Sequence, residues 1–301
     1  MGSGIMPGQT NFVATLRQII SFCINLKTNA QGALIKSATG VNGVWFNYLS
    51  TNVMYKDNNQ LVNPSEDQVL FRYMDFISFY ALLRNQTLFF KRLDHYTDKL
   101  EGQLFDETVS AHMEWLLSKD PVHDLKDATQ RALKNAEHIK LYRQWTLSNS
   151  WNMDDNESYA MWKIYLRGSS EGVAIKTTFK KLTAQLKKNP DFVCTGGMVT
   201  YEALKHFDVG QFSVSANKRP PYAYEKEYRA LIINQYDKLT KEPLFEVGAS
   251  VDIHTEELID QVYISPFATG WFETMIRQLL ADKLPNLKDI DIVWSKIQDE
   301  F

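Results

Sequence analysis

The chain has 301 residues, of which 44% are hydrophobic and 13% aromatic, and this is enough for one large domain with its own core. Its formal net charge of -3 excludes a strongly basic protein that binds a nucleic acid backbone over its whole surface, while a local basic groove stays open. Only two cysteines are present, Cys23 and Cys194, and their spacing suits neither a disulfide framework nor a zinc motif. We therefore expect a protein of the reducing cytoplasm.

The N-terminal part predicts an extension rather than a membrane anchor. Apolar side chains recur every three or four positions in residues 11–26, which predicts an amphipathic helix. Arg17 and Asn25 interrupt this run, whereas a membrane helix needs about 20 apolar residues, so we expect no membrane association. Residues 28–66 are rich in Asn, Gly, Ser and Thr. We thus place a helix and connector in residues 1–66 and an α+β domain in residues 67–301.

Strands and helices are interspersed along the rest of the chain. The expected strands are short apolar runs bounded by turn residues: 68–74, 87–93, 145–151, 172–178, 197–204, 228–233 and 289–297. The expected helices have apolar positions at helical spacing: 75–85, two segments of 105–147 divided at Pro121, 154–166, 179–188 and 270–284. Asp75 is the expected cap of the first of these helices, and Asp154 with Glu157 would form a capping box.

The order of the elements indicates the fold class. No expected strand is followed by a glycine-rich phosphate loop, which excludes a Rossmann or P-loop fold. The prediction is a single α+β domain with a mixed, mainly antiparallel sheet flanked by helices, carrying a helical N-terminal extension.

One charged residue stands inside an expected strand. A buried Arg72 would need an anion, either a carboxylate of this protein or a phosphate of a ligand. The alternative is that Arg72 occupies a solvated strand position.

A polar turn supplies a second candidate site. Asp98 and Glu101 lie three residues apart and, with His95, could bind a metal ion. The alternative is that the turn uses Asp and Gly for backbone reasons.

Three aromatic residues could form a stacking wall for a planar ring. They are Trp151, Trp162 and Tyr165, which fall within fifteen positions of the sequence. The alternative is core packing, which is the more common role of aromatic residues at helical spacing.

Two carboxylates, Glu225 and Glu227, stand at the start of an apolar strand. At a two-residue spacing both point to the same side of the strand, where like charges repel. A carboxylate in this position can bind a ribose hydroxyl and stabilise the positive charge that develops when a glycosidic bond breaks. The alternative is an edge strand with an outward charged face.

Several segments together resemble a bacterial family, the domain of unknown function 2971. The similarity spans about residues 68–297 and is most specific in "ESYAMWKIY", "GVAI" and "EKEYRALI". The name of that family implies no activity.

The order of the motifs also resembles, more distantly, the ADP-ribosyltransferases of the Arg-Ser-Glu type. This resemblance implies that Arg72 holds the phosphates or ribose of NAD and that Ser148 or Ser150 shapes the pocket. Glu227 would be the catalytic carboxylate, and Glu225 would deprotonate or orient the acceptor. This chain has "SNSW" where that family usually has a Ser-Thr-Ser triplet, and a long helical insertion precedes it.

The function implied by this resemblance is an NAD-dependent ADP-ribosyltransferase-like enzyme, acting as a bacterial toxin or a phage-defence effector. NAD would be its substrate, and a protein, a nucleic acid or water would accept ADP-ribose. An antitoxin or another defence protein would be its partner. Two alternatives stay open: a noncatalytic module that binds a nucleotide or a protein, and a metal-dependent nuclease that uses Asp98 and Glu101.

Overall fold

The computed structural model describes residues 50–51, 53–119, 125–187, 192–204, 210–283 and 290–297, which belong to one compact unit, Phe46–Phe301. The helix expected in residues 11–26 lies outside the described residues. The domain boundary after residue 66 stays a prediction, and the end of the expected connector contributes two short strands to the sheet.

The elements alternate much as the sequence indicates. In chain order they are β1 (Ser50–Thr51), β2 (Val53–Tyr55), β3 (Val69–Asp75), α2 (Phe76–Asn85), β4 (Thr87–Arg92), η1 (Leu93–His95), α3 (Asp106–Lys119), α4 (Leu125–Tyr142), η2 (Arg143–Trp145), β5 (Leu147–Asn152), α5 (Tyr159–Leu166), β6 (Gly172–Thr178), α6 (Phe179–Gln185), β7 (Phe192–Met198), α7 (Gln211–Ser215), η3 (Pro220–Glu225), β8 (Glu227–Ile232), β9 (Gly248–Asp252), α8 (Thr255–Leu258), β10 (Gln261–Ile264), α9 (Gly270–Lys283) and β11 (Asp291–Trp294). The η elements are 3-10 helices. Within these described elements, no helix is long and apolar enough to cross a membrane.

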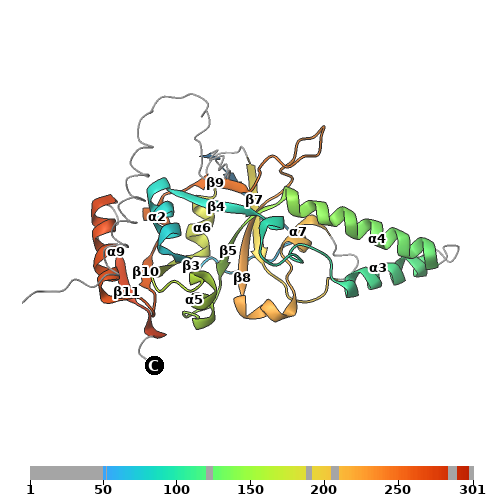
Figure 1. The fold of residues 1–301 in the computed structure, drawn as a ribbon. Helices are drawn as coiled ribbons and strands as arrows, with labels where there is room; N and C mark the ends of the chain where they lie inside the picture. Colours follow the sequence, from blue (N-terminus) through green and yellow to red (C-terminus); the bar gives the residue numbers. More distant parts are fainter. Residues whose placement is uncertain are drawn as a thin grey trace, which may run out of the picture. The chain divides into compact units, whose positions relative to one another are not determined.

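The strands form one 11-stranded sheet (Figure 1). Its main path runs β1-β9-β4-β5-β3-β6-β10-β11, and β8, β7 and β2 continue from the other edge of β5. Only the β1–β9, β2–β7 and β10–β11 pairs are parallel among the described strands. The prediction of a mixed, mainly antiparallel sheet with helices is confirmed.

Strand β5 is the branch point of this sheet. One of its edges pairs with β8 along the whole strand, whereas the other edge pairs with β4 near Ser148 and with β3 only at Asn152. Between these two contacts, side chains instead of backbone N–H groups donate hydrogen bonds to backbone carbonyls. Asn149 Nδ2 donates to the carbonyl of Phe89 at 2.9 Å, and Arg72 Nη1 donates to the carbonyl of Ser150 at 3.0 Å. We call this divergence of β3 and β4 along β5 the fork.

Two apolar clusters cover the sheet. The larger one contains Trp151 and Tyr228 of the sheet and the buried sides of α2, α6, α8 and α9. The smaller one lies under α5 and contains Trp162, packed edge-on against Tyr73 with ring centroids 4.9 Å apart. Because β3 is covered on both sides, apolar residues point to both of its faces, with Arg72 standing between them.

The N-cap of α2 agrees with expectation. Asp75 accepts a hydrogen bond from the backbone N–H of Ser78 at 2.7 Å, which confirms it as the N-cap of α2. The helix ends at Gln86, which adopts a left-handed conformation with φ of 53° and donates its backbone N–H to Leu82.

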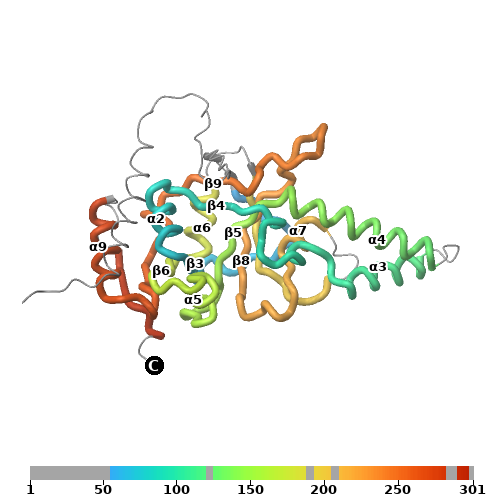
Figure 2. Tube along the Cα trace, in the orientation of Figure 1, coloured from blue at the N-terminus to red at the C-terminus, as the bar shows by residue number. Residues whose placement is uncertain are grey.

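A helical hairpin separates β4 from β5. Helices α3 and α4 pack against each other, and the hairpin extends away from the sheet (Figures 1 and 2). The chain therefore leaves the sheet after β4 and returns to pair beside the same strand, with Arg92 opposite Leu147.

Two local predictions were wrong. The strand expected over residues 197–204 is β7, which ends at Met198, and only an isolated bridge at Thr200 follows. Gly196 lies inside β7, at a position that requires glycine because a Cβ there would approach the Tyr228 hydroxyl to 2.2 Å. The capping box was also misassigned, since Ser158 caps α5.

Candidate functional site

Strand alternation sorts the candidate residues between the two faces of the sheet. Ser150 pairs with Arg229 and Asn152 pairs with Glu227, so these side chains share one face. Trp151 and Tyr228, at the alternate positions, point into the larger apolar cluster. Therefore the serines of β5 and the carboxylate of β8 lie on one face, and Trp151 lies on the other.

Arg229 is the centre of a buried ionic network. Its Nε lies 2.9 Å from Glu227 Oε1, its Nη2 lies 2.9 Å from Glu227 Oε2, and its Nη1 donates to the carbonyl of Ser215 at 2.7 Å. Nη2 also forms an ion pair with Glu101. The Arg229 side chain is fully buried, so this bidentate pairing replaces the hydration that the guanidinium loses.

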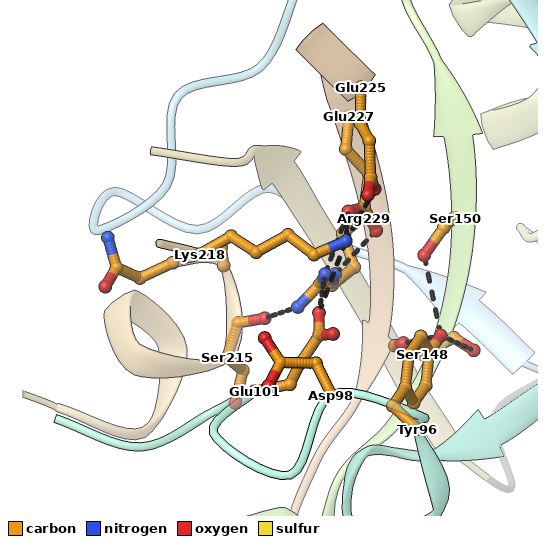
Figure 3. Close-up of polar contacts among 12 residues, drawn as sticks. Tyr96, Asp98, Glu101, Ser148, Ser150, Ser215, Lys218, Glu225, Glu227 and Arg229 are labelled. Carbon is orange, nitrogen blue, oxygen red and sulfur yellow. Dashed lines mark hydrogen bonds and ion pairs between the residues drawn. The ribbon is translucent and has the colours of Figure 1, made fainter. Parts of the chain in front are cut away.

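Lys218 explains why two carboxylates share one side of the chain. Its Nζ lies 2.5 Å from Glu225 Oε2 and 3.2 Å from Glu227 Oε2 (Figure 3). The same ammonium lies 3.8 Å from Glu101. Glu225 and Glu227 thus converge on one buried cation, which offsets their mutual repulsion.

The two carboxylates differ in their affinity for protons. Burial favours the neutral form of Glu227, but Arg229 and Lys218 outweigh it and lower the pKa to about 2. A hydrogen bond from Ser150 acts in the same direction. Burial raises the pKa of Glu225, and Lys218 opposes that rise only in part. Glu227 is accordingly the firmly ionised member, and Glu225 takes up a proton more readily.

Ser148 and Ser150 lie beside Tyr96. The Tyr96 hydroxyl is 2.6 Å from Ser148 Oγ and 3.5 Å from Ser150 Oγ (Figure 3). The guanidinium carbon of Arg229 is 5.9 Å from the centre of the Tyr96 ring. Tyr96 therefore joins the serines of β5 to the ionic network of β8.

Arg72 extends into the fork from the face of Trp151, because the preceding residue, Phe71, pairs with Asn152. Besides its bond to Ser150, its guanidinium carbon lies 5.6 Å from the centre of the Trp151 ring. Within the described ranges, no carboxylate forms an ion pair with Arg72. Burial lowers the pKa of Arg72, and the nearby Tyr165 and Tyr96 oppose this shift. The sequence suggested either a carboxylate of this protein or a phosphate of a ligand as the anion for Arg72, and the described chain provides no such carboxylate.

The three candidate aromatic residues have different surroundings. Trp151 and Trp162 are fully buried, and their indole N–H groups donate to Asn149 and Glu157. They pack in the core, so neither presents a ring face to a ligand in this conformation. Tyr165 has an exposed fraction of 38%, and burial together with Glu227 raises the pKa of its hydroxyl. Tyr165 is the member of the trio with an exposed side chain.

The acidic turn is tied into the site by cations. Asp98 Oδ2 lies 2.9 Å from Arg219 Nη2, and Glu101 pairs with Arg229. Among the residues that the structure describes, no group of three or more His, Cys, Asp and Glu side chains could hold a metal ion. The two acidic residues of the turn therefore serve here as partners of arginines.

The sequence interpretation missed the cations of this site. Arg229 could have been found, because it lies two positions after Glu227 on the same strand face. Lys218 precedes Glu225 by seven residues and reaches it only through η3, so no strand or helix period indicates the contact. Tyr96 comes from a turn far away in sequence.

Comparisons with known proteins give limited information. No family model matches the chain, so the resemblance to the domain of unknown function 2971 stays a prediction, and no curated protein matches it. Two solved structures are similar, both of DarT from Thermus sp. 2.9. The structure in complex with carba-NAD+ is 10% identical with a TM-score of 0.36, and the similarity covers 79% of this chain and 100% of that chain. The structure in complex with ADP-ribosylated ssDNA is 10% identical with a TM-score of 0.35, and the similarity covers 79% of this chain and 99% of that chain. At this level of similarity, the ligands of DarT are not transferred to this chain.

Proposed function

We propose that this protein is an NAD-dependent ADP-ribosyltransferase-like enzyme of the Arg-Ser-Glu type. The observation that carries the proposal is the convergence of Arg72, Ser150 and Glu227 from the adjacent strands β3, β5 and β8. Arg72 donates to the carbonyl of Ser150, Ser150 pairs with Arg229 of β8, and Arg229 binds Glu227. Arg72 and Ser150 are 78 positions apart in sequence and are in contact, and this contact supports the proposal.

Glu227 has the properties needed to stabilise a developing positive charge. In the proposed reaction, the bond between the ribose anomeric carbon and the nicotinamide nitrogen breaks, and nicotinamide leaves with the electron pair. The ionised Glu227 accepts a hydrogen bond from a ribose hydroxyl and stabilises the oxocarbenium-like ribose. Its low pKa keeps it charged at neutral pH, and Arg229 fixes its orientation.

Glu225 is suited to act on the acceptor. Its raised pKa favours the uptake of the proton that an acceptor hydroxyl, amine or water loses when it attacks the anomeric carbon. The acceptor is a protein, a nucleic acid or water, and the biological role is that of a bacterial toxin or phage-defence effector restrained by a partner. Both parts of this assignment follow the family resemblance.

The test is nicotinamide release from NAD by the wild type, Glu227→Gln and Glu225→Gln. Glu227→Gln keeps the shape but removes the charge, and we expect a loss of about 100- to 1,000-fold in rate. Glu225→Gln should spare release into water and reduce the transfer of labelled ADP-ribose to an acceptor. The matched control is Glu242→Gln, at an exposed residue in a turn, which should leave both activities unchanged.

The outcomes separate the alternatives. Equal release by the wild type and Glu227→Gln, with both variants folded, would contradict the proposal. NAD binding without turnover would favour a noncatalytic binding module. Nucleic acid cleavage that stops on addition of a chelator would favour the nuclease.

A further inference from the structure

Glu225 and Glu227 depend on different cations. Both oxygens of Glu227 accept hydrogen bonds from Arg229, since Oε1 lies 2.9 Å from Nε and Oε2 lies 2.9 Å from Nη2. Glu225 relies on Lys218, whose Nζ lies 2.5 Å from Glu225 Oε2 (Figure 3). Among the residues that the structure describes, Lys218 is the only cation that forms an ion pair with Glu225. Loss of Lys218 would therefore leave Glu225 without a cation, while Glu227 would keep Arg229.

The backbone around Lys218 is anchored to the segment that follows β7. The backbone N–H of Lys218 donates to the carbonyl of Thr200 at 2.9 Å. The side-chain Nδ2 of the preceding Asn217 lies 3.0 Å from the Thr200 carbonyl, 2.9 Å from the Thr200 hydroxyl and 2.9 Å from the carbonyl of Glu202. Asn217 is buried, so these bonds are shielded from water. Lys218 thus reaches Glu225 from a fixed position.

The ion pair also spans the 3-10 helix that leads into β8. Lys218 precedes η3, and Glu225 is its last residue. The Lys218 ammonium lies 5.1 Å from the centre of the Tyr222 ring, within this helix. The backbone carbonyl of Glu225 accepts a hydrogen bond from Asn152 Nδ2 of β5 at 2.7 Å. Asn152 therefore fixes the backbone of Glu225, and Lys218 fixes its carboxylate.

The charges of this cluster are not balanced. Three carboxylates, Glu101, Glu225 and Glu227, share two cations, Lys218 and Arg229. Arg229 pairs with Glu101 and Glu227, so the carboxylate left uncompensated by the loss of Lys218 would be Glu225. Burial already raises the pKa of Glu225, and the charge of Lys218 opposes this rise.

The other titratable groups around Glu225 cannot replace Lys218. Burial raises the pKa of the tyrosine hydroxyls that interact electrostatically with Glu225, so they carry no charge at neutral pH: Tyr165, Tyr201 and Tyr224. Lys226 follows Glu225 in sequence, but its ammonium pairs with Asp154 at 3.0 Å. The ionisation of Glu225 therefore depends on one ammonium group.

We propose that Lys218 is a positioning residue of the acceptor step: it holds Glu225 beside Glu227 and keeps Glu225 ionised. As the bond between the acceptor and the anomeric carbon forms, the proton of the acceptor hydroxyl or amine moves to the Glu225 carboxylate. This role in transfer rests on the proposed function. The control of the charge of Glu225 by Lys218 does not, because the ion pair exists whether or not catalysis occurs.

The first experiment follows the NMR signal of the Glu225 carboxyl carbon against pH, with Glu225→Gln used for its assignment. Lys218→Met removes an opposite charge in direct contact, so the titration of Glu225 should move upward by about 1–3 pH units. Lys218→Arg keeps the charge and should restore the wild-type titration. Lys226→Met is the matched control, because it removes the same charge from the next residue and should leave the titration unchanged. An unchanged titration of Glu225 in a folded Lys218→Met overturns the proposal.

The second experiment measures two activities against pH with radiolabelled NAD: nicotinamide release, and labelling of the macromolecules of a clarified bacterial lysate. Labelling by the wild type should fall at acid pH as Glu225 is protonated. In Lys218→Met this fall should occur at a higher pH, by the same interval as in the NMR titration, and Lys218→Arg should restore the wild-type profile. A merely structural role would lower labelling equally at every pH. Nicotinamide release by Lys218→Met should persist, because Glu227 keeps Arg229.

The outcomes separate this inference from the proposed function. A shifted NMR titration in a protein that releases no nicotinamide overturns the proposed function and supports the control of Glu225 by Lys218. Nicotinamide release without labelling by the wild type, or with an unshifted labelling profile in Lys218→Met, keeps the cleavage of NAD and overturns the positioning role.

Urea unfolding checks that each variant is folded. If Lys218→Met does not fold, Lys218→Met combined with Glu225→Gln removes the unpaired carboxylate as well, and its labelling is compared with that of Glu225→Gln alone. Equal labelling supports the proposal, because Lys218 acts through Glu225. A further loss in the double variant overturns it.

Discussion

The start of β8 and the fork use buried charge in opposite ways. At β8 the carboxylates are interleaved with cations, and each has a partner: Asp98, Glu101, Glu225 and Glu227 against Lys218, Arg219 and Arg229. At the fork, Arg72 and Lys91 have hydrogen-bond or aromatic neighbours but, in the described chain, no carboxylate. The comparison shows that one region is electrostatically complete within the protein, while the other gains from a ligand that brings negative charge.

The largest effect is expected from breaking the β8 network. Arg229→Met removes the partner of two buried carboxylates, Glu101 and Glu227, and should lower the free energy of unfolding by about 3–5 kcal/mol at pH 7. Urea unfolding monitored by tryptophan fluorescence measures this change. The deficit should shrink toward acid pH as the orphaned carboxylates become protonated. A loss below about 1 kcal/mol would mean that the network contributes no more than an exposed ion pair.

Glu225, the last residue of η3, and Glu227, the first residue of β8, should give opposite pH dependences of stability. The pKa of Glu227 is lower in the folded protein, so its stabilisation is present above its unfolded pKa of 4.5 and is lost as the pH falls toward about 2. As the pH rises from about 2 to 4.5, the free energy of unfolding of the wild type should thus increase by a few kcal/mol relative to that of Glu227→Gln.

The folded pKa of Glu225 is raised instead, so the stabilisation of its neutral form is present below pH 4.5 and is lost as the pH rises through the folded pKa. Glu225→Gln should therefore gain stability relative to the wild type between pH 4.5 and 7. Urea unfolding at several pH values measures both differences. If the difference in free energy of unfolding between the wild type and the variant changed with pH in the same direction for both variants, the assignment of one low and one raised pKa would be contradicted.

The smallest effect is expected at the fork. Arg72→Gln loses one hydrogen bond to the Ser150 carbonyl, but it also removes a buried cation without a carboxylate partner. The free energy of unfolding should change by only about 1 kcal/mol. NAD or ADP binding should weaken instead, measured as a smaller rise of Tm with ligand. A destabilisation as large as that of Arg229→Met would show that both regions depend on their cations for folding, and the contrast between them would fail.

Local patterns predicted what depends on local physics. Asp75 is followed by apolar residues at helical spacing, and it caps α2 as expected. The strands carrying Arg72 and Glu227 were recognised from apolar runs, because such runs are typical of strands covered on both faces. The boundary of β7 was missed: the expected strand begins at Gly197, whereas β7 runs over Phe192–Met198 and includes Gly196, which packs against Tyr228.

The partners of the site residues could not be read from spacing. Glu101 meets Arg229 across 128 positions of sequence, and Lys218 meets Glu225 through a turn that no periodicity describes. The tryptophans that suggested a stacking wall lie in two separate apolar clusters, Trp151 in the larger one and Trp162 in the smaller one. Sequence spacing fixes which side of a strand a residue faces, whereas its partner depends on how distant segments meet.

The helical hairpin between β4 and β5 has a consequence for folding speed. Pairing Arg92 with Leu147 requires a long segment to close, and the entropy cost of closure grows with its length, by about 0.6 kcal/mol for each doubling. The contacts between α3 and α4 join residues that are closer in sequence than Arg92 and Leu147, so the hairpin can form early and bring its two ends together before β4 and β5 pair. The strands that carry Lys91 and Ser148 would then pair as fast as if a much shorter loop connected them.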